Sequence, residues 1–317
     1  METWMSRIPD SKKLKFINIP VTYDSCAYYV NSLSTNFAKT QFYTVKQQLE
    51  IGTRKLDLRV VDRNKYKDKD EDLILCHGIC DCYASNSCGN LKKLTYKSIL
   101  LDIRKFLEKN PSETVMIGMQ KGRGKNTMVL KRAYELLDKL VGDIILNYDS
   151  NLTLEAGRGK IINLRSIEEI SDDKVPSKKT FKINSLYKGT GIEEVHSKYQ
   201  KYKTFKVNGY LKIQEMKDMF ELYHMTINEA ENKENSSQIL FPISYSISCT
   251  GEKDYLFPCP RDQAEIVHSF LQRDGVLKKG YYYGWLNMDF ANYQSNYKLI
   301  DTNFYWLIIY LYFNKKQ

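Results

Sequence analysis

The sequence predicts a single α/β domain built on a mainly parallel sheet. Short apolar segments alternate with longer ones whose apolar residues recur at helical spacing, over nearly the whole chain. The 317 residues can bury one barrel-sized core, and no Pro/Gly/Ser-rich linker or internal repeat divides them. Residues 1–300 are therefore expected to form the domain, followed by an apolar tail over residues 301–317.

The first predicted strand is the apolar run through Leu14, Phe16, Ile17 and Ile19. Because proline lacks the N–H that a central strand needs, we expect Pro20 to end this strand. The polar residues Thr22 to Ser25 then form a loop. A polar loop at the carboxyl end of a strand is where α/β barrels place their chemistry.

The next predicted strand is Lys55–Val60, after a helical or irregular stretch from Phe37 to Glu50. Within it Leu and Val alternate with Asp57 and Arg59, so acid and guanidinium share one face. In a barrel that face is the interior, where charges are paired or used in the site. An ordinary surface strand is the alternative interpretation.

The remaining elements continue the alternation. A charged loop, Asn64–Asp72, leads to a strand at Leu73–Cys76, with His77 at its carboxyl end. The pattern then predicts helices at Leu94–Lys109, Asn126–Val141, Gly209–Lys233 and Gln263–Arg273, and strands at Val115–Met119, Lys160–Leu164, Ile239–Ser248 and Tyr281–Met288. The Met and aromatic stripe of the Gly209–Lys233 helix is expected to be core.

The apolar tail Asn303–Phe313 is shorter than the roughly 20 residues of a membrane span. We expect a buried last helix, and the alternative is an aromatic segment in a bilayer interface. The N-terminus lacks the apolar core of a signal peptide, so the expected compartment is cytoplasmic or peripheral to a membrane, with secretion requiring a leader already removed.

The net charge indicates the kind of binding partner, and the cysteine spacing bears on a metal site or disulfides. The net charge of +10 favours anionic partners, and without a nucleic-acid-binding motif an anionic membrane surface is preferred to nucleic acid. Four cysteines lie close together but in no common zinc pattern: Cys76, Cys80, Cys82 and Cys88. Structural thiols are the first interpretation, local disulfides the second and a metal site the third.

Several segments resemble, in order, motifs of the phosphatidylinositol-specific phospholipase C family, in its small, single-domain, bacterial-type form of the X domain. They are WMSRIPDS (Trp4–Ser11), Ile17–Ser25, QQLEIGTRKLDLRV (Gln47–Val60), LILCHGICD (Leu73–Asp81), DIRKFLEKNPSETVMIGMQKG (Asp102–Gly122), GRGKIINL (Gly157–Leu164) and YYGWLNMDF (Tyr282–Phe290). The match is weakest between Ile167 and Gln238. The resemblance implies a single TIM-like (β/α) barrel, distorted or incompletely closed, that acts as a monomer without a cofactor.

The resemblance also implies a reaction on phosphatidylinositol or glycosyl-phosphatidylinositol. A base removes the proton of the inositol 2-hydroxyl, which attacks phosphorus to give a cyclic phosphate, and an acid protonates the diacylglycerol oxygen. The family uses two histidines, whose ordinary pKa of about 6.5 suits both roles. His77 matches the acid and Asp24 the carboxylate beside it.

Further positions follow from the same resemblance. Arg59 matches the arginine that neutralises the phosphate. It replaces the calcium-binding acid of larger eukaryotic members, so no metal is expected. Asp57 is the neighbouring acid, and Asp289 matches the residue that orients the base. The inositol-holding positions fall near Lys121, Arg165 and Tyr199, with a one-residue ambiguity in register at the first two and Gln120 on the stricter alignment of the first.

The base position departs from the family pattern, which reads Thr-His-Asp-Ser where this chain has Thr-Tyr-Asp-Ser. A phenol with a pKa near 10 is protonated at pH 7 and is a poor proton acceptor, unless Arg59 lies close enough to lower that pKa. Two hypotheses follow. The chain is a metal-independent phosphodiesterase slowed by Tyr23, or a degenerate relative that binds inositol phospholipid headgroups without turnover.

Overall fold

The computed structural model describes residues 1–30, 38–63, 73–85, 89–123, 128–148, 151–166, 181–183, 213, 216–217, 220, 224–234, 244–247 and 260–304. The strands are β1 (Ile19–Thr22), β2 (Lys55–Asp62), β3 (Leu73–His77), β4 (Cys80–Asp81), β5 (Tyr83–Ser85), β6 (Leu91–Lys93), β7 (Val115–Lys121), β8 (Ile145–Asn147), β9 (Ile161–Ser166), β10 (Phe181–Ile183), β11 (Ser244–Ile247) and β12 (Trp285–Met288).

The described α-helices are α2 (Val45–Glu50), α3 (Tyr96–Lys109), α4 (Met128–Val141), α5 (Leu154–Gly157), α8 (Ile227–Glu234), α9 (Pro260–Leu271) and α10 (Tyr293–Asp301). Short 3-10 turns cover Trp4–Arg7, Leu14–Phe16, Gly142–Ile144 and Thr302–Phe304. Several helices start where the sequence supplies a cap. The Thr95 hydroxyl accepts from the N–H of Ser98 at the start of α3, and Thr44 and Gln47 form a reciprocal capping box at α2.

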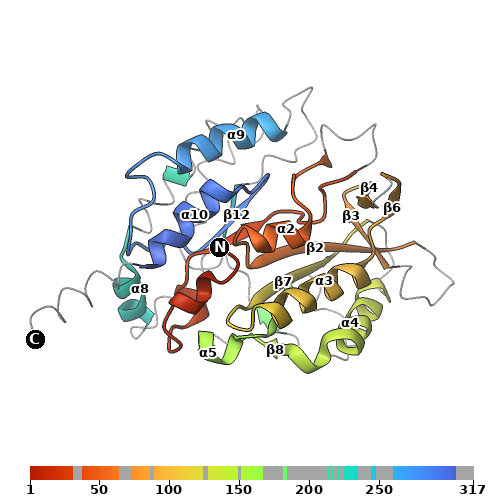
Figure 1. The fold of residues 1–317 in the computed structure, drawn as a ribbon, viewed down its shortest axis with the longest axis horizontal. Coiled ribbons are helices and arrows are strands. Elements are labelled where there is room, and N and C mark those ends of the chain that lie inside the picture. The colour runs from red at the N-terminus through yellow and green to blue at the C-terminus, as the bar shows by residue number, and fades with distance from the viewer. Residues whose placement is uncertain are drawn as a thin grey trace, which may run out of the picture.

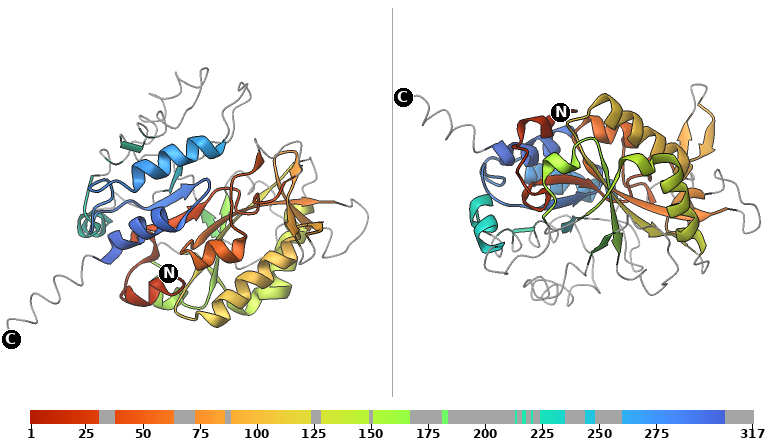
Figure 2. Two further views of the ribbon diagram at one scale, coloured as in Figure 1. Left: turned by 45° about the horizontal axis from the view of Figure 1, so that its top comes forward. Right: turned by 90° about the horizontal axis from the view of Figure 1, so that it is seen from below.

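The sheet carries most of its strands in parallel, in the order β10-β9-β7-β2-β1-β12-β11. Helices α3 and α4 lie side by side against β2 and β7, while α9 and α10 lie beside β12 and β1 (Figures 1 and 2). Among the described strands, β10 and β11 stand at the two ends of this order and do not pair with each other. The predicted fold class, an incompletely closed TIM-like α/β barrel, is confirmed.

Burial follows the alternation of the strands. On β2, Leu56, Leu58 and Val60 are fully buried and pack with α3 and α4, whereas Lys55, Asp57 and Arg59 keep part of their surface exposed on the opposite, inner face. The lower barrel interior is apolar and contains Trp285 and residues of β1, β7 and β9. The charged side chains of β2 therefore line the upper part of a packed interior.

The N-terminal segment lies over the lower end of the barrel. Arg54 and Glu113 are both fully buried, with Arg54 Nε 2.8 Å from Glu113 Oε2. Glu113 also accepts from the backbone N–H of Met5, and the indole N–H of Trp4 donates to the carbonyl of Gly52. Because every charge here has a partner, the ion pair holds this segment against the sheet.

The prediction that Pro20 ends the first strand is wrong. Strand β1 runs from Ile19 to Thr22, and the preceding Leu14–Phe16 is a 3-10 turn. Pro20 pairs with Leu286 of β12, but pairing with β2 starts only at Val21. The missing N–H therefore falls just before the β2 ladder begins, and the Pro20 carbonyl still accepts from Arg54 N.

Strand β3 departs from the expected parallel order. It pairs antiparallel with β2, with Leu73 opposite Asp62 and Leu75 opposite Val60. The chain therefore reverses direction after β2, and β3 runs back toward the carboxyl ends of the parallel strands, where it places His77. The predicted placement of His77 at the same barrel end as the Thr22–Ser25 loop holds, although by a hairpin rather than a parallel strand.

The single long helix predicted at Gly209–Lys233 is wrong. His224–Thr226 is not helical, and α8 starts at Ile227 because Thr226 and Glu229 form a capping box. Thr226 also bridges to Tyr281. The described part of the predicted apolar stripe is nevertheless core, since Met216 is buried and Phe220 packs against the same cluster.

The structure also describes three of the four clustered cysteines and the start of the C-terminal tail. Cys76, Cys80 and Cys82 are buried free thiols, which confirms the structural-thiol interpretation for these three, and Cys88 lies outside the described residues. Asn303 and Phe304 are buried, and the rest of the tail also lies outside them. None of the helices within the described ranges combines the length and apolarity of a membrane span.

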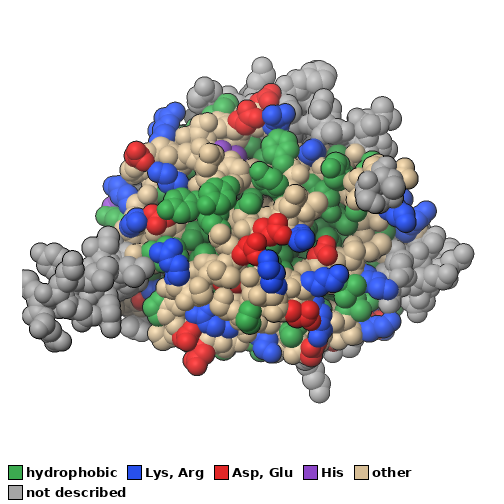
Figure 3. Space-filling view, in the orientation of Figure 1, with side chains coloured by type: hydrophobic (Ala, Val, Ile, Leu, Met, Phe, Trp, Pro, Cys, Tyr) green, Lys and Arg blue, Asp and Glu red, His purple; other side chains and the backbone are tan. Residues whose placement is uncertain are grey.

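Acidic and basic side chains are interspersed on the face that carries α2, α3, α4 and α10 (Figure 3). The net positive charge is thus not gathered into a basic stripe on that face, as nucleic-acid-binding surfaces require.

Candidate active site

Three strands of the sheet bring the predicted catalytic residues to one end of the barrel. Tyr23 and Asp24 follow β1 directly, and the Tyr23 N–H donates to the carbonyl of Met288, the last residue of β12. Asp289 follows Met288. Asp57 and Arg59 project from the inner face of the adjacent β2. The parallel register therefore assembles side chains that lie more than 200 residues apart in the sequence.

The backbone of Asp24 is held in an unusual conformation. Its φ of 40° is in the left-handed region, where Asp and Asn are the non-glycine residues most often found. Thr40 Oγ1 donates to the Asp24 carbonyl at 3.1 Å, and Gln41 Nε2 donates to the Tyr23 carbonyl at 2.8 Å and the Met288 carbonyl at 3.1 Å. These contacts hold the loop so that the buried Asp24 carboxylate faces the site.

Arg59 lies between two carboxylates. Its Nε is 2.9 Å from Asp24 Oδ1, and one terminal nitrogen is 3.6 Å from Asp57 Oδ2. The Asp24 backbone N–H also donates to Asp57 Oδ2 at 3.3 Å. The guanidinium is thus fixed in place while 22% of its side chain remains exposed at the barrel end, where an anion can reach it.

An oxygen atom lies close to each ring nitrogen of His77. Nδ1 donates to the Ala38 carbonyl at 2.7 Å, and Nε2 lies 3.0 Å from Asp24 Oδ2. Burial by itself would lower the pKa of His77, but the Asp24 carboxylate and the Ala38 carbonyl outweigh burial and raise the pKa above its ordinary value. The Asp24 carboxylate thus stabilises the imidazolium form, the form that can act as a general acid.

Tyr23 lies against Arg59 and His77. The Arg59 guanidinium carbon is 4.9 Å from the centre of the Tyr23 ring, and the Tyr23 and His77 rings meet edge-to-face at 5.9 Å. Arg59 does approach Tyr23, yet the pKa of Tyr23 is raised, because burial and the nearby carboxylates outweigh the guanidinium. The phenol is neutral at pH 7.

Asp57 and Lys55 titrate closer to neutrality than is ordinary. Burial, and then the nearby Asp24 carboxylate, raise the pKa of Asp57 to about 6 despite the opposing effect of Arg59. Burial lowers the pKa of Lys55 to about 8. The Lys55 ammonium lies 5.2 Å from the centre of the Trp285 ring, below Asp57 on the same strand face.

Solved structures of bacterial phospholipases have a similar fold. The chain superposes on the phosphatidylinositol-specific phospholipase C of Listeria monocytogenes with a TM-score of 0.65 and 20% identity, covering 95% of this chain and 98% of that one. The F249X mutant of the Staphylococcus aureus enzyme gives 0.65 and 18%, covering 95% and 97%. The fold is that of the bacterial phosphatidylinositol-specific phospholipases C.

Sequence comparison confirms the resemblance to the phosphatidylinositol-specific phospholipases C. The chain is 32% identical over 126 residues to a 1-phosphatidylinositol phosphodiesterase of Listeria monocytogenes, covering 39% of this chain and 34% of the relative. It is 26% identical over 169 residues to that of Staphylococcus aureus strain Newman, covering 51% and 49%. The matches therefore span about a third to a half of the length of these relatives. No protein-family model matches the chain.

In this phospholipase C fold, the backbone of Asp289 is contacted by a buried histidine. The side chain of Asp289 is buried, and its backbone carbonyl accepts from Nε2 of the buried His268 at 2.9 Å. The second ring nitrogen of His268 lies 2.8 Å from the Ser295 hydroxyl. Burial lowers the pKa of His268, so this histidine is a neutral structural residue.

The predicted inositol-holding residues are placed unequally. Lys121 ends β7 and pairs with Val60 of β2, so it lies at the same end of the barrel as Arg59. Arg165 is on β9, opposite Met119 of β7, and only its backbone is described. Tyr199 lies outside the described residues, as does His196. Within the described ranges, no group of three His, Cys, Asp or Glu side chains is arranged to hold a metal ion.

Sequence reasoning missed the residues that support the candidate site. Thr40, Gln41 and the Ala38 carbonyl fix Tyr23, Asp24 and His77, but they lie in none of the matched motifs. Lys55 could have been found, because it shares the period-2 face of Asp57 and Arg59.

Proposed function

We propose that this protein is a metal-independent phosphodiesterase of the phosphatidylinositol-specific phospholipase C type, slowed by the tyrosine at its base position. The observation that carries the proposal is the contact of one buried carboxylate, Asp24, with both Arg59 and His77. This arrangement places a fixed cation for a phosphate beside a protonated imidazole for a leaving group.

His77 and Asp24 together supply the acid. The attack of the inositol 2-hydroxyl on phosphorus forms one P–O bond and breaks the bond to the diacylglycerol oxygen, which takes a proton from the imidazolium. Asp24 keeps His77 charged before this step through the contact of 3.0 Å. The products of this step are diacylglycerol and an inositol cyclic phosphate.

Arg59 supplies the charge for the phosphate. The guanidinium is oriented by two carboxylates and stays partly exposed, so it is preorganised for the negative charge that develops on the phosphoryl oxygens. A fixed arginine on β2 takes the place of a calcium ligand, which is why turnover should not depend on added metal.

Proton removal from the 2-hydroxyl is the weak step. Tyr23 is neutral, so it can donate a hydrogen bond but accepts a proton poorly. Asp57 is the better acceptor among the described residues of the cluster, since its pKa near 6 leaves it ionised yet basic at pH 7. Lys121, Arg165 and Tyr199 complete the proposal as the groups that hold the inositol ring.

The membrane partner is an anionic bilayer surface, which the protein meets peripherally. Ile79, two residues beyond His77, is 86% exposed, and Tyr29 and Phe42 are each 44% exposed. The Lys39 ammonium lies 5.8 Å from the Tyr29 ring and 5.2 Å from the Phe42 ring. Apolar side chains with a neighbouring cation beside a site are the composition that interfacial binding requires.

The decisive experiment measures release of water-soluble inositol cyclic phosphate from phosphatidylinositol vesicles with EDTA present. Weak wild-type turnover that rises in Tyr23→His and disappears in His77→Gln is the expected result. Tyr23→Phe is the matched control, because it keeps the ring contacts but removes the hydroxyl. Equal activity in Tyr23→Phe and wild type is expected if the phenol does not act as a base.

A second candidate function rests on the same neutral phenol. If neither wild type nor Tyr23→His turns over the lipid but both bind phosphatidylinositol vesicles more tightly than Arg59→Gln, the protein is a headgroup-binding relative without catalysis. Binding that is unaffected by Arg59→Gln would oppose both functions, because both place the phosphate on this guanidinium.

A further inference from the structure

A second cavity lies at the opposite end of β12 from the catalytic cluster. Its lining includes Tyr281, Tyr282 and Tyr283, which precede β12, whereas Asp289 follows that strand. The separation from Tyr283 to Asp289 corresponds to roughly 20 Å at about 3.3 Å per residue. The cavity has a volume of about 420 Å³, within the range of small-molecule sites.

One wall of this cavity is rigid. The Tyr283 hydroxyl accepts from the Lys278 N–H at 2.8 Å and donates to the Val276 carbonyl at 3.2 Å, which closes the turn around the ring. The Tyr282 hydroxyl donates to the Lys15 carbonyl at 2.7 Å, and its N–H donates to the Met225 carbonyl at 2.9 Å. The wall is therefore formed before any ligand arrives.

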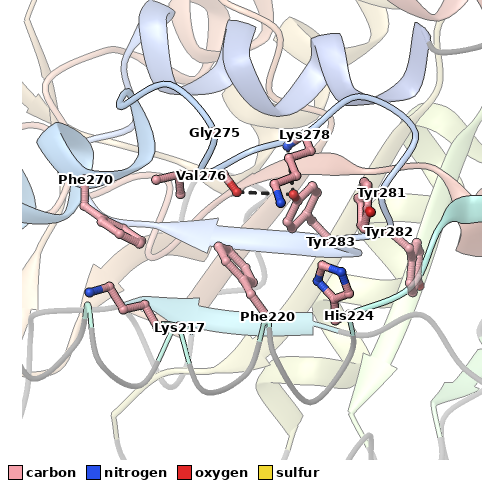
Figure 4. Close-up of a pocket in the computed structure, with 10 residues that line it drawn as sticks. All are labelled: Lys217, Phe220, His224, Phe270, Gly275, Val276, Lys278, Tyr281, Tyr282 and Tyr283. Carbon is pink, nitrogen blue, oxygen red and sulfur yellow. Dashed lines mark hydrogen bonds between the residues drawn. The ribbon is translucent and has the colours of Figure 1, made fainter.

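The other wall faces it across the cavity. Figure 4 shows Lys217, Phe220 and His224 on this side. Phe220 meets Tyr283 edge-to-face at 4.9 Å, and His224 lies 4.9 Å from Tyr281. Half of the lining residues are Phe or Tyr, so the space suits a planar ring system that stacks or meets these rings edge-on.

The described residues that line the cavity include two cationic side chains. Among the described residues that line it there is no Asp or Glu, whereas Lys217 and Lys278 are both present. Within the described part of the chain neither lysine forms an ion pair; their ammonium groups lie 5.6 Å from the Phe270 ring and 5.7 Å from the Tyr281 ring. Two cations beside an aromatic slot are complementary to an anion that has an aromatic body.

We propose that this cavity is a second ligand site, distinct from the catalytic site, which binds small aromatic anions between the two lysines. The aromatic walls would hold the ring system, and Lys217 and Lys278 would pair with its sulfonate, carboxylate or phosphate. The site does not depend on phosphodiester cleavage at the other end of the barrel.

Titration with anilinonaphthalene sulfonate, followed by its fluorescence, tests the site. We expect saturable binding, and weaker binding of the uncharged analogue N-phenylnaphthylamine. Lys217→Gln and Lys278→Gln should each weaken the sulfonate by roughly three- to tenfold. Lys279→Gln is the matched control, because Lys279 is the next residue but pairs with Asp301 at 3.1 Å, and it should leave the affinity unchanged.

Filling the cavity gives an independent reading. Val276→Trp should abolish sulfonate binding while inositol cyclic phosphate release and the melting temperature stay near wild type. Equal affinity for the charged and uncharged probes, or affinity unchanged in both lysine variants, would overturn the proposal. So would retained binding in a folded Val276→Trp. Loss of lipid cleavage in every variant would instead concern the proposed catalytic function.

Discussion

The contact between Asp24 and His77 makes a measurable prediction. Asp24→Asn removes the carboxylate charge 3.0 Å from His77 Nε2 but keeps the side-chain shape. Asparagine also accepts the left-handed backbone at this position, where φ is 40°. The substitution therefore isolates the charge, whereas Asp24→Ala would add backbone strain.

The size of the effect follows from distance and burial. Two unit charges about 4 Å apart interact by about 4 kcal/mol at an effective dielectric constant of about 20. Arg59 lies on the same carboxylate and offsets part of this attraction. An opposite charge at this range typically shifts a pKa by about one to three units. Because burial remains and acts in the other direction, we expect the pKa of His77 in Asp24→Asn to fall below its ordinary value.

Proton NMR titration of the histidine ring protons measures this change directly. The chain has four histidines, and loss of one signal in His77→Gln assigns the resonance. Asp57→Asn is the control, since Asp57 is not among the groups that influence the pKa of His77 most. A His77 pKa that is the same in Asp24→Asn and wild type would refute the proposed acid pair.

The same contact affects stability with a definite sign. The folded-state pKa of His77 lies above the unfolded value of about 6.5. Protonated His77 therefore stabilises the fold fully below that value, and the contribution is lost as the pH rises through the folded-state pKa. In Asp24→Asn, where we expect the His77 pKa to lie below the unfolded value, this component of the pH dependence should reverse its sign, which thermal melts between pH 5 and pH 8 would detect.

Three further predictions concern other groups. The pKa of Asp57 is raised from 3.8 to about 6. This shift corresponds to roughly 3 kcal/mol of folding stability, which is lost as the pH rises through 6. Asp57→Asn should therefore raise the melting temperature at pH 7 and change it less at pH 4. Ile79→Asp should weaken partition onto anionic vesicles by more than about tenfold, because an apolar side chain of this size contributes roughly 1.5–3 kcal/mol when buried. Sedimentation with vesicles measures the partition. It would show no change if the turn that carries Ile79 stays in water. Arg54→Met leaves the buried Glu113 carboxylate unpaired and should cost about 3–5 kcal/mol of unfolding free energy in a urea titration, with a smaller loss in the double variant Arg54→Met/Glu113→Leu.

Much of the fold could be predicted from local pattern. The alternation on β2 identified both the strand and its charged inner face, and α3 begins and ends as capping and Pro111 require. The motif Asp102–Gly122, which contains Glu113, identified the fold and not the active site. Glu113 pairs with Arg54 in the core.

The errors in the fold come from pairing, which local pattern does not contain. Pro20 lies within a strand because β2 starts to pair only at Val21. The antiparallel direction of β3 depends on its partner and not on its own residues. The helix break before α8 did have a local signal, the Thr226–Glu229 capping box. The apolar residues on both sides of it continue at helical spacing, which is why a single helix was predicted.

The residues of the candidate site also fall into those that the sequence marks and those that only tertiary contacts reveal. Asp24, Arg59 and His77 stand in motifs, and the structure brings them together. Thr40, Gln41 and His268 support the site only through tertiary contacts, so no spacing in the sequence marks them. The direction of the Tyr23 pKa likewise depends on burial, which a sequence does not give.

The pairing of β1 with β12 has a consequence for how the protein forms. Ile19 and Trp285 lie side by side in the sheet although more than 260 residues separate them in the chain. Closing so long a loop is slow, so this contact belongs to the late steps of folding. On the ribosome, β1 has one flank unpaired until the residues of β12 have been made. A chain interrupted before Trp285 would keep that flank as an open edge, prone to pairing with other molecules.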